Sequence, residues 1–268
     1  MEGRKRKFLT ELQKKSSLRA ESGLYLADGL RLCMEVPADV LEEYYVSESF
    51  LKEHGSEPFL QTLAGFPHSV LTDSEMKAVS DTVHPQGIMA LVRQKRTKGL
   101  KELLSDSRTP LLFLLEDVRD PGNLGTIIRA GEAAGVTGIL MNKGTADLYS
   151  PKTVRSTMGS IFRMNFLKLE DLVTAAAELS SGRYTEGRKL HCYAADLKAS
   201  RSYSSFDYTE PCAFMIGNEA NGLSEAMRGA ADEKVFIPMQ GQVESLNAAM
   251  AAVILVFEAA RQRNLQLT

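Results

Sequence analysis

Three short segments in the second half of the chain combine glycines with polar side chains in a way that could bind a ligand. Residues 120–125 read Asp-Pro-Gly-Asn-Leu-Gly, residues 217–222 read Gly-Asn-Glu-Ala-Asn-Gly, and residues 237–247 lead to the start of an apolar helix. Glycine lets the backbone approach a ligand closely, and amide and carboxylate side chains supply several hydrogen-bonding groups. The first segment precedes an expected helix and could cradle an anion at its N-terminus.

Each segment also has a purely structural interpretation. The first can be a tight turn, and Arg129 on the following helix has the spacing to pair with Glu132 on the protein surface. The third can be a loop whose Ser245 is the N-cap of the helix. The first segment matches neither the G-x-G-x-x-G nor the G-x-x-x-x-G-K pattern, so the dinucleotide and P-loop fingerprints both fail.

The histidines and cysteines do not predict a metal site. His54, His68 and His84 lack the spacing of metal ligands, and we interpret them as surface or capping residues. The three cysteines are widely spaced without a C-x-x-C pair, which argues against structural zinc and against a disulfide framework. We therefore expect no metal, and the reducing cytoplasm is the default compartment.

The second half of the chain is predicted to be an open α/β sheet covered by helices. Residues 111–115 form an apolar run typical of a strand buried on both faces. With a helix over 126–134 and a strand over 136–141 they make a β-α-β unit, which indicates a parallel sheet. Further strands are expected at 191–195, 213–216 and 235–237, and helices at 169–179, 224–231 and 245–263. Ligands bind at the carboxyl ends of such strands, where the three segments lie.

The first half is predicted to be a smaller α/β domain. Its expected strands are 25–27, 44–46 and 88–92, and its expected helices are 30–36 and 49–54. Between residues 93 and 110 the composition turns polar, which indicates a linker with a short helix. The predicted division is an N-terminal domain over 1–95, a linker over 96–108 and a C-terminal domain over 109–268.

Positive charge is concentrated at the N-terminus. Residues 1–20 contain seven Lys and Arg against two Glu, whereas the whole chain has a net charge of -2 at pH 7. A local basic arm can contact the phosphates of a nucleic acid whatever the net charge of the protein. A solvated tail without a ligand is the alternative. The candidate RNA-binding residues are Arg4, Lys5, Arg6 and Lys7, with Arg155 in a segment of small residues as a further candidate.

No membrane association is expected. The N-terminus lacks the apolar run of a secretory signal, and the most apolar stretch, residues 246–260, is shorter than the roughly 20 apolar residues of a membrane span. This stretch is typical of a buried core helix.

Taken in order, the three segments resemble the three motifs of the SpoU/TrmH family of RNA ribose 2′-O-methyltransferases, in the SPOUT superfamily. The resemblance covers residues 111–263. It includes Arg129 after the first segment, Gly-Leu-Ser at 222–224, and Ile-Pro-Met and Ser-Leu-Asn within the third segment. The first half looks like the small RNA-binding domain of the rRNA-modifying branch, which resembles a ribosomal protein.

The resemblance implies a parallel sheet whose C-terminal chain forms a deep trefoil knot, with S-adenosyl-L-methionine as the cofactor. It also implies a homodimer packed through the knotted domain, in which Arg129 acts near the partner's cofactor. The cofactor-binding residues that it implies are Gly217, Ile237, Met239, Ser245 and Leu246. The polar active-site residues that it implies are Asn123, Arg129, Glu219 and Asn247.

The chemistry of methyl transfer agrees with these residue types. A sulfonium methyl group is already electrophilic, so its transfer to a hydroxyl needs positioning and a route for the proton but no metal. Because a guanidinium stays protonated in proteins, we expect Arg129 to clamp the target phosphate and stabilise developing alkoxide charge rather than act as a base.

Two other classes of protein are weighed against an RNA methyltransferase. A nucleotide-dependent oxidoreductase would need G-x-G-x-x-G and an acidic residue after the second strand, where Asn142 stands instead. A non-catalytic RNA-binding protein on the same fold would be expected to have lost the polar residues of the three motifs, which are all present. We therefore expect ribose 2′-O-methylation of structured RNA, with 23S rRNA as the favoured substrate and tRNA as the alternative.

Overall fold

The computed structural model describes residues 3–55, 58–105, 109–183, 189–243 and 245–263. The chain forms two compact units: unit 1 consists of the residues up to 96 together with 147–162, and unit 2 consists of 97–146 and the residues from 163 onward. Residues 106–108 of the expected linker lie outside the described part of the chain.

Residues 147–162, which the sequence pattern assigns to the C-terminal domain, pack within unit 1. Asp147 forms a salt bridge of 2.6 Å with the buried Arg19. The ring centroids of Tyr149 and Tyr25 lie 4.7 Å apart. These contacts join segments more than a hundred residues apart, and no local periodicity encodes such a pairing.

The secondary structure of unit 1 alternates short strands and helices. Its strands are β1 (Leu24–Asp28), β2 (Leu41–Ser47), β3 (His68–Leu71) and β4 (Ile88–Arg93). Its helices are α1 (Gly3–Lys14), α2 (Ser16–Ser22), α3 (Leu30–Met34), α4 (Glu48–His54), α5 (Pro58–Thr62), α6 (Asp73–Val79) and α9 (Pro151–Thr157), with the 3-10 turns η1 (Leu63–Gly65) and η2 (Ser160–Phe162).

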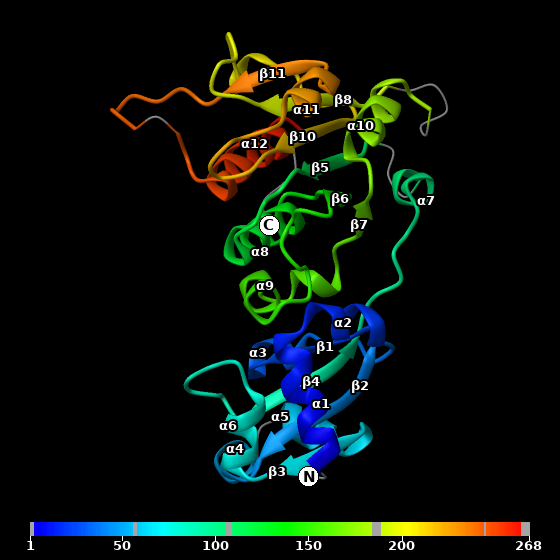
Figure 1. Ribbon diagram of the computed structural model, residues 1–268, viewed down its shortest axis with the longest axis vertical. Helices are drawn as coiled ribbons and strands as arrows, with labels where there is room; N and C mark the ends of the chain where they lie inside the picture. The colour runs from blue at the N-terminus through cyan, green and yellow to red at the C-terminus, as the bar shows by residue number, and fades with distance from the viewer. Residues whose placement is uncertain (1–2, 56–57, 106–108, 184–188, 244, 264–268) are drawn as a thin grey trace. The chain divides into compact units, whose positions relative to one another are not determined.

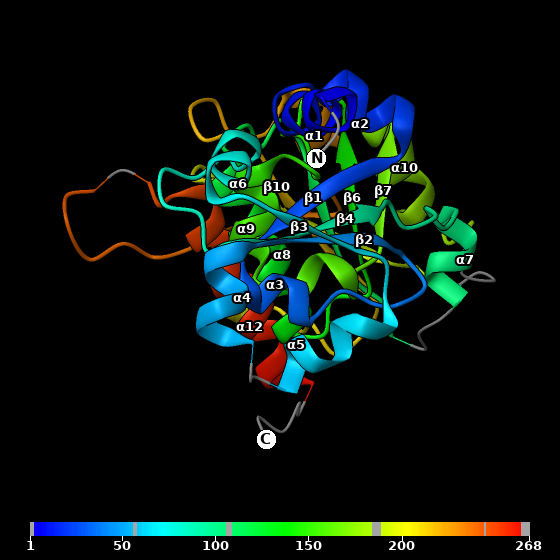
Figure 2. The same cartoon turned by 90° about the horizontal axis from the view of Figure 1, so that it is seen from below.

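The sheet of unit 1 has the order β1-β4-β2-β3, and β4 runs antiparallel to both of its neighbours. Figure 2 shows α1 and α2 on one face of this sheet and α3, α4 and α5 on the other. Alternate strand residues such as Leu26 and Tyr45 pack against α1 and α6 in one hydrophobic cluster.

The basic N-terminus is a packed helix rather than an arm or a tail. Leu9 and Leu12 of α1 are buried in the core of unit 1, so hydrophobic contacts anchor this helix to the sheet. The basic residues 4–7 lie in the same helix, ahead of Leu9 and Leu12.

Unit 2 contains the longer strands and helices of the second half. Its strands are β5 (Leu111–Leu115), β6 (Gly138–Asn142), β7 (Phe166–Leu169), β8 (His191–Ala195), β9 (Arg201–Ser202), β10 (Cys212–Ile216) and β11 (Glu233–Phe236). Its helices are α7 (Leu100–Ser105), α8 (Pro121–Ala133), α10 (Leu172–Ser180), α11 (Glu225–Ala230) and α12 (Ala248–Gln262), with the 3-10 turn η3 (Tyr203–Ser205).

The sheet of unit 2 is parallel throughout, in the order β7-β6-β5-β10-β8-β11-β9, as predicted for an open α/β sheet. Helices α8 and α12 pack together on one face, and α10 and α11 pack together on the other (Figure 1). The central strands β5 and β10 are buried along their whole length, which explains their uninterrupted apolar sequences. The predicted bounds of β5 and β8 are confirmed.

Three predicted helix starts are wrong. Helix α10 begins at Leu172 instead of residue 169, because Leu169 ends β7 and Asp171 caps the helix. Helix α8 begins at Pro121 instead of residue 126, because Asp120 caps it and proline is well suited to the first helical turn. Helix α12 begins at Ala248, and its N-cap is Asn247 rather than Ser245. The Asn247 side chain accepts hydrogen bonds from the backbone of Ala249 and Met250. No helix among the described residues is long and apolar enough to cross a membrane.

Candidate active site

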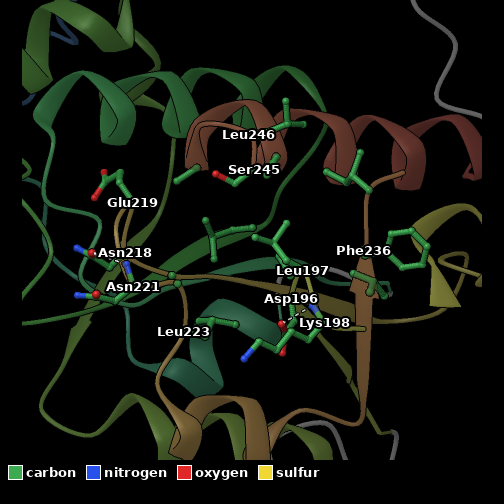
Figure 3. Close-up of a pocket in the computed structure, with 18 of the residues that line it drawn as sticks. Asp196, Leu197, Lys198, Asn218, Glu219, Asn221, Leu223, Phe236, Ser245 and Leu246 are labelled. Atoms are coloured by element: carbon green, nitrogen blue, oxygen red, sulfur yellow. Dashed lines mark hydrogen bonds between the residues drawn. The ribbon is translucent and has the colours of Figure 1, made fainter. Parts of the chain in front are cut away.

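A cavity of about 420 Å³ lies at the carboxyl ends of β8, β10 and β11. Its walls are mainly apolar, with charged side chains between them (Figure 3). The apolar lining residues include Ile216, Leu223, Val235, Phe236, Leu246 and Leu255. The charged lining residues are Asp196, Lys198, Glu219 and Arg228. The position agrees with the rule that ligands bind beyond the carboxyl ends of parallel strands.

All five residues that the sequence predicts to bind the cofactor line this cavity: Gly217, Ile237, Met239, Ser245 and Leu246. Figure 3 shows Ser245 and Leu246 on the side of α12, with Asp196 and Leu223 across the cavity from them. Three stretches of chain, each following a different strand or preceding α12, therefore converge on one volume.

The loop after β10 meets the cavity with bare backbone at Gly217. A Cβ atom on Gly217 would lie 2.2 Å from the backbone carbon of Gly222, so no other residue fits at this position. Asn218 and Gly222 exchange two backbone hydrogen bonds, of 3.1 and 2.9 Å, which close the loop on itself. The Asn218 side chain donates to the carbonyl of Asp117 at 2.9 Å and holds the loop against the segment after β5.

Three of the four predicted active-site residues form one hydrogen-bonded network. The side-chain amide of Asn123 donates to Glu219 Oε1 at 2.9 Å. The side-chain amide of Asn247 donates in turn to Asn123 Oδ1, also at 2.9 Å. Each residue comes from a different sequence motif, so the network joins the starts of α8 and α12 to the loop after β10.

The carboxylate of Glu219 is held in its ionised form. Partial burial acts to raise its pKa, but hydrogen bonds from the Asn123 side chain and from backbone N–H groups, including those of Asp120 and Arg119, outweigh burial and leave the pKa below its usual value. The start of α8 was expected to be able to cradle an anion. The structure shows that two carboxylates of the protein, those of Glu219 and of the capping Asp120, occupy this place.

Arg129 stands apart from this network. Its side chain is exposed on α8 and makes no hydrogen bond or ion pair with any residue that the structure describes. The surface pair with Glu132, the structural alternative suggested by spacing, is not formed, because Glu132 accepts from Arg163 Nε at 2.7 Å. The guanidinium of Arg129 is therefore available to a ligand.

The predicted RNA-binding residues all belong to unit 1. Arg4, Arg6 and Lys7 are exposed on α1, whereas Lys5 pairs with Glu43 at 2.6 Å. Arg155, in α9, forms a salt bridge of 3.0 Å. Its partner is Asp81 of the same unit. Among the described residues, Arg4, Arg6 and Lys7 are thus the members of this set without a salt bridge, although Lys7 interacts electrostatically with Glu11 of the same helix.

The sequence analysis missed the loop after β8. Asp196, Leu197 and Lys198 line the cavity, and the Asp196 carboxylate accepts a hydrogen bond from the Lys198 backbone at 2.9 Å. The signal was available, since residues 191–195 were predicted to be a strand and every carboxyl end of the sheet is a candidate.

The cavity suits S-adenosylmethionine. Its volume is that of a small-molecule site, its apolar walls suit an adenosine, and Gly217 leaves backbone groups open to a ligand. Among the described residues, no group of three or more His, Cys, Asp or Glu side chains could hold a metal ion.

Comparison with known proteins identifies the class. The profile of the SpoU rRNA Methylase family matches residues 110–257, and that of the MRM3-like substrate binding domain matches residues 4–90. The chain belongs to the SpoU rRNA methylase family, and its cofactor is S-adenosylmethionine.

Individual relatives are similar to this chain over nearly its whole length. The chain is 33% identical over 240 residues to the 23S rRNA (guanosine(2553)-2′-O)-methyltransferase RlmP of Bacillus subtilis, covering 89% of both proteins. It is 31% identical to the mitochondrial rRNA methyltransferase 3 of Homo sapiens, covering 93% of this chain and 70% of that protein. The crystal structure of the SpoU methyltransferase AviRb from Streptomyces viridochromogenes with AdoMet superposes with a TM-score of 0.84 at 26% identity, covering 98% of each chain.

Proposed function

We propose that this enzyme methylates the 2′-hydroxyl of a ribose in 23S rRNA, using S-adenosylmethionine bound in the cavity of unit 2. The observation that carries the proposal is the network of Asn247, Asn123 and Glu219, which joins all three motifs beside a cavity of suitable size. The names of relatives such as the Bacillus subtilis enzyme support 23S rRNA as the substrate, with tRNA as the alternative.

Bound S-adenosylmethionine supplies an electrophilic methyl group. The ribose hydroxyl must lose its proton as the new bond between oxygen and the methyl carbon forms and the bond between that carbon and sulfur breaks, so that the thioether S-adenosylhomocysteine is the second product. We assign the proton to a phosphate oxygen of the RNA or to water. Glu219 is a poor general base, because a carboxylate with a lowered pKa and with hydrogen-bonded oxygens has little tendency to accept a proton. We assign to Glu219 the role of fixing Asn123, and through it Asn247.

Arg129 is the residue with a free head group, and we assign it to the RNA. A planar guanidinium can hold a phosphate with two parallel hydrogen bonds and can stabilise negative charge that develops on the ribose oxygen. In this proposal the enzyme is a cytoplasmic homodimer, packed through a knotted C-terminal domain, in which Arg129 serves the cofactor site of the partner chain. The family resemblance supports these features.

Unit 1 is proposed to hold the RNA. Its match to a substrate binding domain supports this role, and the exposed Arg4, Arg6 and Lys7 on α1 provide charge for phosphate contacts. The similarity of its fold to a ribosomal protein, which the resemblance implies, fits the same role.

The proposal is tested by transfer of labelled methyl groups to RNA. Purified enzyme is incubated with labelled S-adenosylmethionine and, in separate reactions, with unmodified 23S rRNA, tRNA or large ribosomal subunits. We expect label in 23S rRNA or in the subunits and none in tRNA. Gly217→Ala, whose added Cβ would collide with the backbone of the loop that lines the cavity, should abolish transfer. Label in tRNA alone would replace the proposed substrate with the alternative.

A further inference from the structure

We infer that Glu116 is a positioning residue, whose carboxylate anchors the far end of the cofactor loop and so sets the shape of the cavity. The cofactor loop is defined here as residues 217–223, which run from the end of β10 to the cap of α11 and line the cavity along their length. The inference rests on the proposed location of the cofactor in that cavity.

Glu116 holds the loop at both of its ends. Its backbone N–H donates to the carbonyl of Ile216 at 2.9 Å and so extends the pairing of β5 with β10 to the point where the loop begins. Its carboxylate accepts two hydrogen bonds from Ser224, where the loop finishes. The backbone N–H of Ser224 lies 2.7 Å from Oε2, and its hydroxyl lies 2.7 Å from Oε1.

Ser224 is itself the N-cap of α11. Its hydroxyl oxygen accepts from the backbone of Met227 at 3.1 Å while its proton goes to Glu116. The loop therefore leaves the cavity into a helix whose N-cap is fixed to the segment after β5. That same segment leads into α8, which carries Asn123. The carboxylate of Glu116 therefore ties the exit of the cofactor loop to the segment that positions Asn123.

The bonding pattern explains why a glutamate suits this position. Two donors of one residue are met by the two oxygens of a planar carboxylate, and glutamine offers a single acceptor oxygen to the same pair. Alanine removes both bonds and leaves the exit of the loop held by Arg228, whose side chain donates to the carbonyl of Leu223 at 2.6 Å, and by the two backbone bonds between Asn218 and Gly222. A loop that adopts the binding geometry only part of the time weakens the apparent affinity for its ligand by that fraction.

The expected consequence is specific to the cofactor. In Glu116→Ala, the KM and Kd for S-adenosylmethionine should rise about tenfold, whereas kcat at saturating cofactor and the KM for RNA should stay within about twofold, because two hydrogen bonds to a charged group are lost away from the reacting atoms. Glu116→Gln, which keeps one acceptor, should recover about half of the loss on a logarithmic scale.

Asp232 provides a matched control. Its carboxylate also accepts from a backbone N–H and a serine hydroxyl, those of Cys192 and Ser180, both at 2.8 Å. Cys192 lies near the amino end of β8, at the opposite edge of the sheet from the cavity. Asp232→Ala should lower Tm about as much as Glu116→Ala does and leave the KM for S-adenosylmethionine unchanged.

The experiment measures Tm, cofactor binding by calorimetry and steady-state kinetics on the full chain of each variant. A selective rise in the cofactor KM of Glu116→Ala, partly recovered by Glu116→Gln, supports the inference. An unchanged cofactor KM, or a fall in kcat alone, overturns it. If Glu116→Ala does not fold, Glu116→Gln gives the same comparison with an expected rise of about threefold.

Gly217→Ala separates this inference from the proposed function. Its added Cβ would collide with the backbone of the loop, so cofactor binding should be lost. Normal binding by Gly217→Ala would place the cofactor elsewhere and refute the proposed site. Lost binding in Gly217→Ala together with normal binding in both Glu116 variants would refute only the role of Glu116.

Discussion

The side-chain amide of Asn123 donates to the carboxylate of Glu219 at 2.9 Å, across 96 residues of sequence. This contact fixes which way the Asn123 amide points, because the nitrogen must face the carboxylate and the oxygen must face the donor of Asn247. The orientation of one side chain thus depends on hydrogen bonds between residues of all three motifs.

The first prediction concerns the coupling within this network. Asn123→Ala and Glu219→Ala should each lower kcat/KM by about a hundredfold, and the double variant should be little worse than the worse single one, because the first change removes the amide and the second removes the acceptor that orients it. Thr126→Ala is the control, since the Thr126 hydroxyl bonds the carbonyl of Gly122 in the same helix, outside the network. Fully additive losses in the double variant would contradict a shared role.

The second prediction separates the two roles of Asn247. Aspartate at this position keeps the oxygen that accepts from Ala249 and Met250 but replaces the donor that faces Asn123 with an oxygen. Asn247→Ala should therefore lower the free energy of unfolding by about 1 kcal/mol, whereas Asn247→Asp should lower it by about 0.5 kcal/mol or less. Both should lose methyl transfer activity. An active Asn247→Asp variant would show that the network is dispensable.

The third prediction concerns Arg129. Because its guanidinium has no partner among the described residues, Arg129→Ala should leave Tm and cofactor affinity unchanged while lowering kcat/KM for RNA by about 10²-fold or more. Arg129→Lys should recover little, since an ammonium lacks the planar fork. Arg163→Ala, which breaks the neighbouring pair with Glu132, is the control and should have little effect. Most of the activity surviving in Arg129→Lys would exclude the clamp.

The fourth prediction concerns pH. The pKa of Glu219 lies below its ordinary value of 4.5 in the folded protein, so its carboxylate stabilises the fold above that pH and the stabilisation is lost as pH falls through the lowered folded pKa. The Tm difference between the wild type and Glu219→Gln should therefore be constant from pH 7 to about 5.5 and should shrink below about pH 4.5. A difference that grows in acid would contradict the lowered pKa.

The sequence predicted the parts of the fold that depend on local patterns. The strand at Leu111–Leu115 is a continuous apolar run because both of its faces are covered, and its bounds are correct. Gly217, Ile237 and Met239 line the cavity because they follow strands of a parallel sheet, whose carboxyl ends meet at one edge, and Ser245 and Leu246 line it just before α12.

The remaining features depend on contacts that sequence patterns do not show. The two glycines near the start of α8 look like a loop, yet Gly125 is buried and the helix begins before it. Asn247 and Ser245 are both good N-caps by type, and the network selects Asn247. Residues 147–162 join unit 1 through contacts between distant segments, such as the salt bridge of Arg19 with Asp147 and the ring contact of Tyr25 with Tyr149.

The most direct test of the central claim identifies the atom that receives the methyl group. RNA labelled by the wild-type enzyme is hydrolysed in alkali, which requires a free 2′-hydroxyl at each point of cleavage. We predict that the label is recovered in an alkali-resistant dinucleotide, because a methylated ribose blocks cleavage at its own position. Label recovered in mononucleotides would mean methylation of a base, and it would contradict the reaction proposed for this site.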